Sequence, residues 1–404
     1  MITIDEARAR TCARYVRMPS ETVVLEDALD RVLAADVIAP IALPPWPASA
    51  MDGFALHAED APGTLRVVDD IAAGRAPSRA LGGGEAARIM TGAMLPPGAD
   101  TVVKIEDVSV DGDLVEVPGV RGVGQHVRAA GSDVSQGARV LEAGTVLGPG
   151  AIGLLAGLGI PTVRVARRPR VAILSTGDEV VAPGARLGPA QIPSANNALL
   201  AAWVRRGGGV PCDLGIVRDD PVAVRAALEE ACTHDLVLTT GGVSVGDHDH
   251  VRDAFHAAGI ALQFWRVDMK PGKPLAYGLA GEVPVFGLPG NPVSCMVNFL
   301  VFARPVLRRM LGDLRPDLPR LRVRMTAPWD RAVGRPEWLR VTLAPHEDGV
   351  PRAHVAATQG SASLQSMSRC DALLLVPADV ARVEGDCEAL VVEPGWSARC
   401  DPPR

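Results

Sequence analysis

Hydrophobic positions change their spacing several times along the chain, and each change marks a segment of different predicted structure. In residues 2–35 apolar side chains recur at the spacing of a helix, with a second amphipathic run at residues 25–33. Four prolines between residues 39 and 47 then favour an extended linker. We therefore expect the chain to begin with helices that lead into a linker.

Residues 49–137 carry short alternating runs separated by Gly, Pro and Asp turns, which is typical of a β-rich domain. Helical spacing returns only near residues 148–158. We therefore expect the β-rich domain to be inserted between residues 1–48 and 138–168, which pack together as a helical linker domain.

The second half of the chain predicts two further domains. Residues 169–313 alternate continuous apolar strands with amphipathic helices, which indicates a three-layer α/β domain with a mainly parallel sheet. Ligands of such sheets bind at the carboxyl ends of the strands. Residues 314–404 return to short strands and predict a small β-barrel or sandwich. The predicted fold class is a multidomain α/β protein with an inserted β-rich domain.

Composition narrows the classes of function. With 404 residues, 48% of them hydrophobic, the chain is long enough for several cores. A net charge of −6 offers no concentrated basic surface, so we expect no nucleic-acid partner. Seven scattered cysteines without a CxxC pair argue against a disulfide framework or structural zinc and fit a reducing, cytoplasmic location. No segment has the length of a membrane span, so we expect no membrane partner.

Two glycine-rich loops follow apolar strands, at residues 235–249 and 287–294. A strand that ends in glycines and opens a helix leaves backbone N–H groups and a positive dipole end for an oxyanion. Two such loops imply a ligand with two anionic parts. The residues expected to contact this ligand are Ser175, Thr176, Gly177, Thr239, Thr240, Gly241, Gly242, Ser244, Pro289, Asn291, Pro292 and Ser294.

Acidic side chains accompany these loops and suggest a divalent metal. Glu179, Asp219 or Asp220, and Asp249 offer hard oxygen ligands from neighbouring strand ends, as magnesium bound with phosphate prefers. The alternative is that the acids only cap helices, which we expect of one of Asp219 and Asp220. The His-Asp-His string at residues 248–250 raises a transition-metal site as a rival.

Two further sets of residues are ambiguous from their spacing. Lys270 and Lys273 lie in a turn stiffened by prolines, and their ammonium groups would neutralise phosphate as point charges. The alternative is that both lysines are simply solvated. Asp52 in its Met-Asp-Gly turn and Thr91 before a glycine are, by spacing alone, structural turn residues.

The chain resembles a known family over nearly its whole length. Its motifs occur in the order and spacing of the molybdopterin molybdotransferases, the MoeA and gephyrin E-domain family. These motifs are SAMDGFA, RIMTGA, GADTVV, STGDEV, TTGGVSVGDHD, KPGKP and GLPGNPVS. The resemblance implies an enzyme that converts adenylylated molybdopterin and molybdate into molybdenum cofactor and releases AMP in a magnesium-dependent step.

The resemblance also implies an elongated homodimer. Each active site would lie between the α/β domain of one subunit and the inserted β domain of the other. This implied arrangement would make Asp52, Thr91 and Asp133 functional residues, and we expect Asp52 to orient the incoming oxyanion. Molybdopterin adenylyltransferase and molybdoenzyme maturation proteins become candidate partners.

The chain departs from the family pattern at a few positions. Ala48 stands where the family usually has Asn, His250 where it often has an aromatic residue, Ala362 where it has Gly, and Cys370-Asp371 where it has Ala-Asn. Two alternatives to the molybdotransferase remain. One is an adenylyltransferase-like enzyme, a class that shares the α/β core but usually lacks the inserted domain and the C-terminal barrel. The other is a gephyrin-like scaffold that binds receptor peptides.

Overall fold

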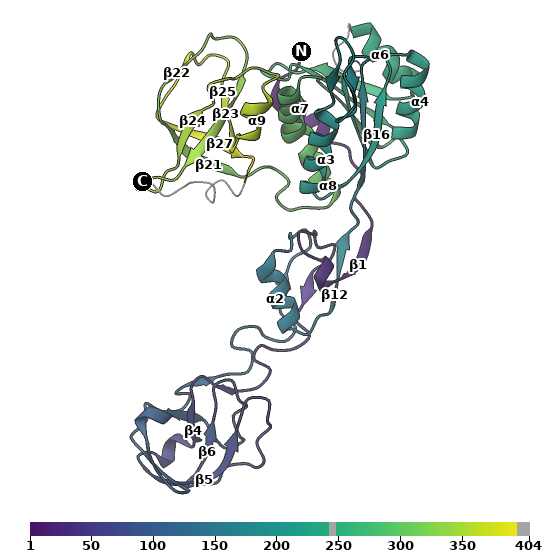
Figure 1. The fold of residues 1–404 in the computed structure, drawn as a ribbon. Coiled ribbons are helices and arrows are strands. Elements are labelled where there is room, and N and C mark those ends of the chain that lie inside the picture. Colours follow the sequence, from purple (N-terminus) through teal and green to yellow (C-terminus); the bar gives the residue numbers. More distant parts are fainter. Residues whose placement is uncertain (242–247, 394–404) are drawn as a thin grey trace. The chain divides into compact units, whose positions relative to one another are not determined.

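The computed structural model describes residues 1–241 and 248–393, without the side chains of residues 248–252 (Figure 1). The chain divides into two compact units, one formed by Met1–Glu21 with Ala166–Arg404 and the other by Thr22–Val165. In the described part of the chain, no helix combines the length and the apolar character that a membrane crossing requires.

A six-stranded sheet forms the centre of the first unit, in the order β16-β13-β17-β20-β19-β18. The strands are β13 (Arg170–Thr176), β16 (Val210–Val217), β17 (Leu236–Gly241), β18 (Ala261–Arg266), β19 (Pro274–Ala280) and β20 (Val283–Leu288). The pairings β13–β16, β13–β17 and β17–β20 are parallel, whereas β19 and β18 extend the sheet antiparallel. The parallel part therefore brings the carboxyl ends of four strands to one edge.

Both faces of this sheet are covered, as the continuous apolar strands predict. Along β13, Val171 and Ile173 pack into one core, while Ala172 and Leu174 pack into another. The first core includes side chains of α1 (Ile4–Cys12), α3 (Asn196–Arg206), α7 (Pro292–Asn298) and α8 (Arg304–Met310), and the second those of α4 (Pro221–Ala231) and α6 (His248–Ala257). Figure 1 shows α4 and α6 on one side of β16 and α3, α7 and α8 on the other. The three-layer α/β architecture is confirmed.

The C-terminal strands close into a barrel in the order β21-β24-β23-β25-β27. These strands are β21 (Arg320–Met325), β23 (Glu337–Ala344), β24 (Arg352–Val355), β25 (Ala372–Val376) and β27 (Asp386–Val391), with the short helix α9 (Leu364–Ser368) between β24 and β25. The barrel joins the α/β part through a parallel bridge of Lys270 with Glu337. Of the two predicted alternatives, the barrel is the correct one.

The second unit contains a six-stranded sheet in the order β7-β4-β6-β5-β9-β8. The strands are β4 (Gly53–Leu56), β5 (Gly63–Ile71), β6 (Glu85–Ile89), β7 (Thr101–Lys104), β8 (Ser109–Asp111) and β9 (Leu114–Val117). The segments that lead into and out of this sheet pair with each other, β2 (Val37–Ile38) with β11 (Arg139–Leu141). α2 (Pro149–Gly157) contributes Leu155 to a small separate core.

The prediction of helices throughout residues 2–35 is wrong beyond α1. Residues 20–24 form strand β1, which pairs with β12 (Thr162–Ala166), and residues 25–33 contain only the 3-10 turn η1 (Leu25–Asp27). Asp30 has a φ of +61°, which a helix does not allow. Buried Val32 and Leu33 instead form bridges with segments far along the chain. α1 also packs into the α/β core, whereas the sequence analysis predicted that it belongs to the helical linker domain.

Candidate active site

The candidate active site lies where parallel strands of the α/β sheet end. The loops after β13, β17 and β20 border a cavity of about 670 Å³. Ser175 and Thr176 line this cavity from β13, Glu179 lines it from the loop that follows, and Thr240 and Gly241 line it from β17. The structure therefore brings together several of the residues predicted at the strand ends.

Gly241 allows two of these strand ends to approach each other. Thr176 and Gly241 are register partners in the parallel pair β13–β17. A Cβ atom at Gly241 would lie 2.0 Å from the carbonyl oxygen of Thr176, and the φ of +108° is one that L side chains rarely adopt. The glycine of the predicted loop is thus required by the backbone geometry.

Asn196 connects three parts of the cavity wall from the start of α3. Its Nδ2 donates hydrogen bonds of 2.8 Å to Thr240 Oγ1 and of 2.8 Å to the carbonyl oxygen of Gly290. Thr240 Oγ1 in turn donates to the carbonyl oxygen of Pro289 at 3.0 Å. These bonds hold the ends of β17 and β20 against α3 and so fix the shape of the cavity.

The C-terminal barrel supplies another wall of the same cavity. Asn291 Nδ2 donates to Ser361 Oγ at 3.1 Å, and the N–H of Val293 donates to the carbonyl oxygen of Ser361 at 3.0 Å. Next to this contact, Ala362 and Leu364 line the cavity. The segment before α9 therefore belongs to the site, although it lies in the C-terminal domain.

Arg340 holds this barrel segment in place from within the protein. Its side chain in β23 is fully buried. Nη2 donates to the carbonyl oxygens of Thr358 and Gly360 at 2.9 and 3.1 Å, and Nε donates to Ser366 Oγ at 2.9 Å. One guanidinium group thus fixes both ends of the segment that carries Ser361.

A second hollow, of about 510 Å³, adjoins the first at Asn291, which lines both. Its cations are Lys270 and Lys273 from the connection between β18 and β19, and Arg335 from the barrel. Lys270 Nζ lies 2.8 Å from Glu337 Oε1, which anchors the ammonium group. Positive charge concentrated in a hollow attracts an anion, and Arg and Lys are the side chains that bind oxyanions.

Of the acids predicted to hold a metal, Glu179 lines the cavity. Asp220 caps α4, because its Oδ1 accepts the N–H of Ala223 at 2.8 Å, which confirms the prediction that one of the two neighbouring acids is a cap. Asp219 is the spare acid. Its burial and the negative charges of Asp178 and Glu179 raise its pKa. Negative charge therefore gathers where the sequence predicted a cation.

The complete metal site stays a prediction. Among the residues whose side chains the structure describes, no three His, Cys, Asp or Glu side chains form a cluster that could hold a metal ion. Gly242 and Ser244 lie outside the described residues, and so does the side chain of Asp249. The rival site at residues 248–250 falls in the same stretch.

Asp52 and Thr91 form a pair in the second unit. Asp52 Oδ1 accepts the N–H of Thr91 at 2.6 Å and its hydroxyl at 2.7 Å. These two bonds lower the pKa of Asp52, because they stabilise the ionised carboxylate. Both residues are exposed, as is Asp133. Asp52 is therefore an accessible carboxylate in a fixed orientation.

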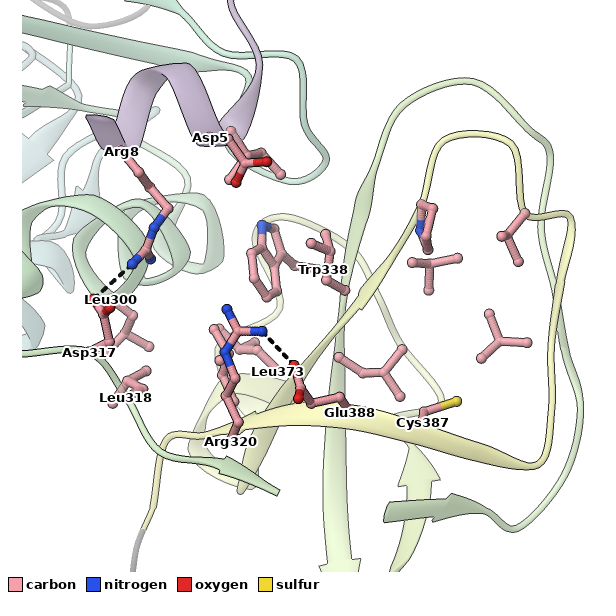
Figure 2. A pocket seen from close by; sticks show the side chains of 18 of the residues that line it. Asp5, Arg8, Leu300, Asp317, Leu318, Arg320, Trp338, Leu373, Cys387 and Glu388 are labelled. Carbon is pink, nitrogen blue, oxygen red and sulfur yellow. Dashed lines mark hydrogen bonds and ion pairs between the residues drawn. The ribbon is translucent and has the colours of Figure 1, made fainter. Parts of the chain in front are cut away.

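Another hollow, of about 500 Å³, lies between α1 and the barrel (Figure 2). Figure 2 shows Trp338 and Leu373 of the barrel facing it, with ion pairs of Arg8 with Asp317 and of Arg320 with Glu388 at its sides. Among the described residues, none lines both this hollow and the strand-end cavity. We do not assign it to the active site.

Three family models match consecutive stretches of the chain. They are the MoeA N-terminal region (domain I and II) at residues 2–159, a probable molybdopterin binding domain at residues 172–309, and the MoeA C-terminal region (domain IV) at residues 322–389. A Mycobacterium tuberculosis protein named molybdopterin molybdenumtransferase 2 is 38% identical over 90% of this chain and 92% of its own length. The chain belongs to the MoeA family.

Further relatives agree with this assignment. The molybdopterin molybdenumtransferase of Haemophilus influenzae is 33% identical over 98% of both chains. Among solved structures, the molybdopterin biosynthesis MoeA protein of Pyrococcus horikoshii matches with a TM-score of 0.83 and 28% identity, over 97% of this chain and 100% of that chain. The fold is therefore the MoeA fold over nearly the whole length.

Within the MoeA fold, the sequence predicted the strand-end loops but not two other contributions to the hollows, one in each. Asn196 and the connection before it, with Ile192 and Pro193, line the cavity, yet no motif marks them. The adjacent amides Asn196 and Asn197 at a helix start were the available signal, and Asn197 accepts a hydrogen bond from Ser175. Arg335 was missed as well, because it precedes a barrel strand far from the loops in sequence.

Proposed function

We propose that this MoeA-family chain is a molybdopterin molybdotransferase, which inserts molybdate into adenylylated molybdopterin, releases AMP and yields molybdenum cofactor. The observation that carries the proposal is the pair of adjoining hollows at the strand ends. One is lined mainly by hydroxyl, amide and apolar groups, with the Glu179 carboxylate, and the lining of the other includes three cations. A substrate that joins a heterocycle to several anionic groups needs both kinds of surface.

The cationic hollow is the proposed place for the anionic parts that react. Molybdate is a dianion, and the substrate brings a phosphoanhydride and a dithiolene, so their approach is repulsive without neutralising charge. Lys270, Lys273 and Arg335 bring positive charge there, which the ion pairs of Lys270 with Glu337 and of Arg335 with Asp268 offset in part. Such preorganised charge stabilises a transition state in which negative charge accumulates.

Magnesium is part of the proposal, and the residues present fit it. Asp219 has its pKa raised by burial and by Asp178 and Glu179, so a cation would relieve an existing repulsion. Mg²⁺ commonly takes one or two carboxylates and completes its shell with water and substrate phosphate. Glu179 and Asp219 would hold the ion, with Asp249 as a third candidate. When bound, it supplies positive charge at the phosphoanhydride oxygens.

The second unit supplies the remaining proposed residues. Asp52 is held by Thr91 as an oriented, ionised carboxylate, and its proposed role is to orient the incoming oxyanion. We further propose a homodimer in which each active site combines this pair and Asp133 with the α/β domain of the other subunit. The resemblance to the family supports this arrangement. Six described cysteines are free thiols, which supports a cytoplasmic location for the reaction.

The alternative of an adenylyltransferase-like enzyme is less well supported. The family models for the MoeA N-terminal and C-terminal regions match residues 2–159 and 322–389, outside the probable molybdopterin binding domain. An enzyme built only from the shared α/β core would not need either region. In this chain the barrel contributes residues to the lining of both hollows, so it has a direct part in the proposed site.

AMP release tests the proposal directly. Purified protein is incubated with adenylylated molybdopterin, magnesium and molybdate, and AMP is followed by chromatography. We expect Asp52→Ala and Glu179→Ala each to slow the release by about tenfold or more, as loss of an oriented charge in an active site does. Asp111→Ala and Glu229→Ala, which remove exposed acids elsewhere in the two units, are the controls and should stay near wild type. Full turnover in both Asp52→Ala and Glu179→Ala would refute the proposed roles.

A further inference from the structure

Two polar atoms in the wall of the strand-end cavity are buried without a hydrogen-bond partner in the described part of the chain. They are Asn196 Oδ1 and Thr176 Oγ1. The residues are 8% and 1% exposed, and both line the cavity. Buried polar atoms are normally paired, so each unpaired one calls for an explanation.

The orientation of the Asn196 amide follows from its partners. Nδ2 lies 2.8 Å from the carbonyl oxygen of Gly290, which can only accept a hydrogen bond. It also donates to Thr240 Oγ1, whose own hydrogen is directed to the carbonyl oxygen of Pro289. An exchange of the amide oxygen and nitrogen would place two acceptors against each other. Oδ1 is therefore the atom without a partner, and it can only accept.

Thr176 provides the second unpaired group from the last position of β13. Its hydroxyl can accept or donate, so it can serve a donor on the same ligand. The surrounding wall includes apolar Ile192, Pro193 and Leu364. Apolar side chains with a few fixed polar atoms are the usual lining of a site for a small organic ring.

We propose that Asn196 and Thr176 form a subsite for the N–H edge of an amino-substituted nitrogen heterocycle. Oδ1 of Asn196 accepts the N–H, and the apolar residues contact the ring. The identification of this ring as part of adenylylated molybdopterin rests on the proposed function. Because the cationic hollow adjoins the cavity at Asn291, the subsite would orient the substrate with its heterocycle in the larger cavity and its anionic end beside the lysines.

Two pairs of small ligands test the subsite on the purified full-length chain by calorimetry. The first pair is pterin-6-carboxylate and its analogue without the 2-amino group. The second pair is AMP and purine riboside 5′-monophosphate, which lacks the 6-amino group. We expect the wild type to bind the amino-bearing member of one pair about tenfold more tightly, the effect of one good hydrogen bond. The pair that shows the preference identifies the ring as pterin or adenine.

Variants attribute this preference to the named atoms. Asn196→Ala should reduce the tenfold ratio toward one, because a cycle of ligand and protein changes isolates their interaction. Thr176→Val replaces an unpartnered hydroxyl with a methyl group of similar shape, so it should weaken binding of the preferred ligand while the melting temperature stays constant or rises. Thr11→Val, in α1 and equally buried but lining neither hollow of the site, is the matched control and should leave both affinities unchanged.

The outcomes separate this subsite from the proposed function. If neither ligand pair shows a preference, or if Asn196→Ala and Thr176→Val both keep it, the subsite is wrong even when AMP release proceeds. If the preference appears and depends on Asn196 or Thr176, the subsite stands even when molybdate causes no AMP release. In that second case only the assigned reaction fails.

Discussion

At the scale of single residues, Asp219 gives the most direct test of the predicted cation, because its carboxylate lies near two other acids. Its neighbour Asp220 takes the helix cap, which leaves the Asp219 carboxylate near Asp178 and Glu179. Burial is the largest cause of its raised pKa, and the two negative charges add to it. A carboxylate in such surroundings disfavours its own ionised form until positive charge arrives.

This arrangement predicts how stability depends on pH. The pKa of Asp219 is higher in the folded state than in the unfolded chain, so the folded state binds this proton more tightly. The contribution of Asp219 to stability therefore falls as pH rises from about 3.8 through the raised pKa. Asp219→Asn should remove that contribution and raise the melting temperature at pH 7. Added magnesium should stabilise the wild type more than the variant, because it binds the folded state.

Thermal melts across pH, with and without magnesium, measure both effects. Asp220→Asn is the matched control, since asparagine also caps helices well and should leave the pH profile nearly unchanged. Identical profiles and identical magnesium responses for Asp219→Asn and the wild type would contradict the assignment.

At the scale of elements, the barrel segment before α9, which strand β23 holds in place, forms the wall of the strand-end cavity that the α/β loops do not form. Arg340 links them, with Nη2 on two carbonyl oxygens and Nε on Ser366. The pKa of Arg340 is lowered by burial, which reflects the cost of placing a cation in the interior. Hydrogen bonds to several acceptors offset that cost. Only a planar guanidinium can reach these acceptors at once, so its shape matters in addition to its charge.

We predict that Arg340→Lys weakens both the barrel and the site. Lysine keeps the charge but loses the planar fork, so the free energy of unfolding should fall by about 2–3 kcal/mol. The KM for molybdate should rise more than kcat falls, because the segment carrying Ser361 would no longer be held. Denaturant unfolding and AMP-release kinetics provide the measurements.

Arg308→Lys is the control for this element. Arg308 is also buried and donates to Asp313 and to the carbonyl oxygen of Gly207, but it lies in α8 and lines neither hollow of the site. It should lose stability without a change in the KM for molybdate. An equal rise in KM in both variants would show that Arg340 acts only through general stability.

At the scale of the whole molecule, the proposed active-site residues are divided between the two compact units. Residues 22–165 carry Asp52, Thr91 and Asp133, whereas the strand-end cavity and the cationic hollow belong to the other unit. The proposed reaction uses residues of both. In the proposed homodimer, each subunit contributes one unit to each of the two sites.

Mixing inactive variants tests this sharing. If Asp52→Ala and Glu179→Ala subunits exchange freely, half of the dimers are mixed and each mixed dimer has one intact site, so activity should return to about a quarter of the wild type. The mixture is unfolded and refolded together, and AMP release is compared with that of the separately treated variants. Light scattering measures the mass of the particle. If the protein is a dimer and the refolded mixture has only the average activity of the two variants, shared sites are excluded.

The sequence by itself determined the features that depend on neighbours in the chain. The apolar strands with their glycine loops, a helix cap at one of Asp219 and Asp220 before Pro221, and the alternation that forms the β sheets all follow from local backbone chemistry. Such features have the same physical cause in any fold. The family motifs extended them to the expected reaction and to Asp52, whose own spacing indicated only a turn.

Only the tertiary structure decided which distant segments meet. Asn291 contacts Ser361 across seventy residues, Arg335 joins two lysines from another domain, and the amide oxygen of Asn196 is buried without a partner in the described part of the chain. Residues 25–33 have helical spacing, yet Val32 and Leu33 form bridges, because partners at residues 146 and 165 bury them. Burial and close approach arise from packing between segments, which the spacing of residues along the chain does not encode.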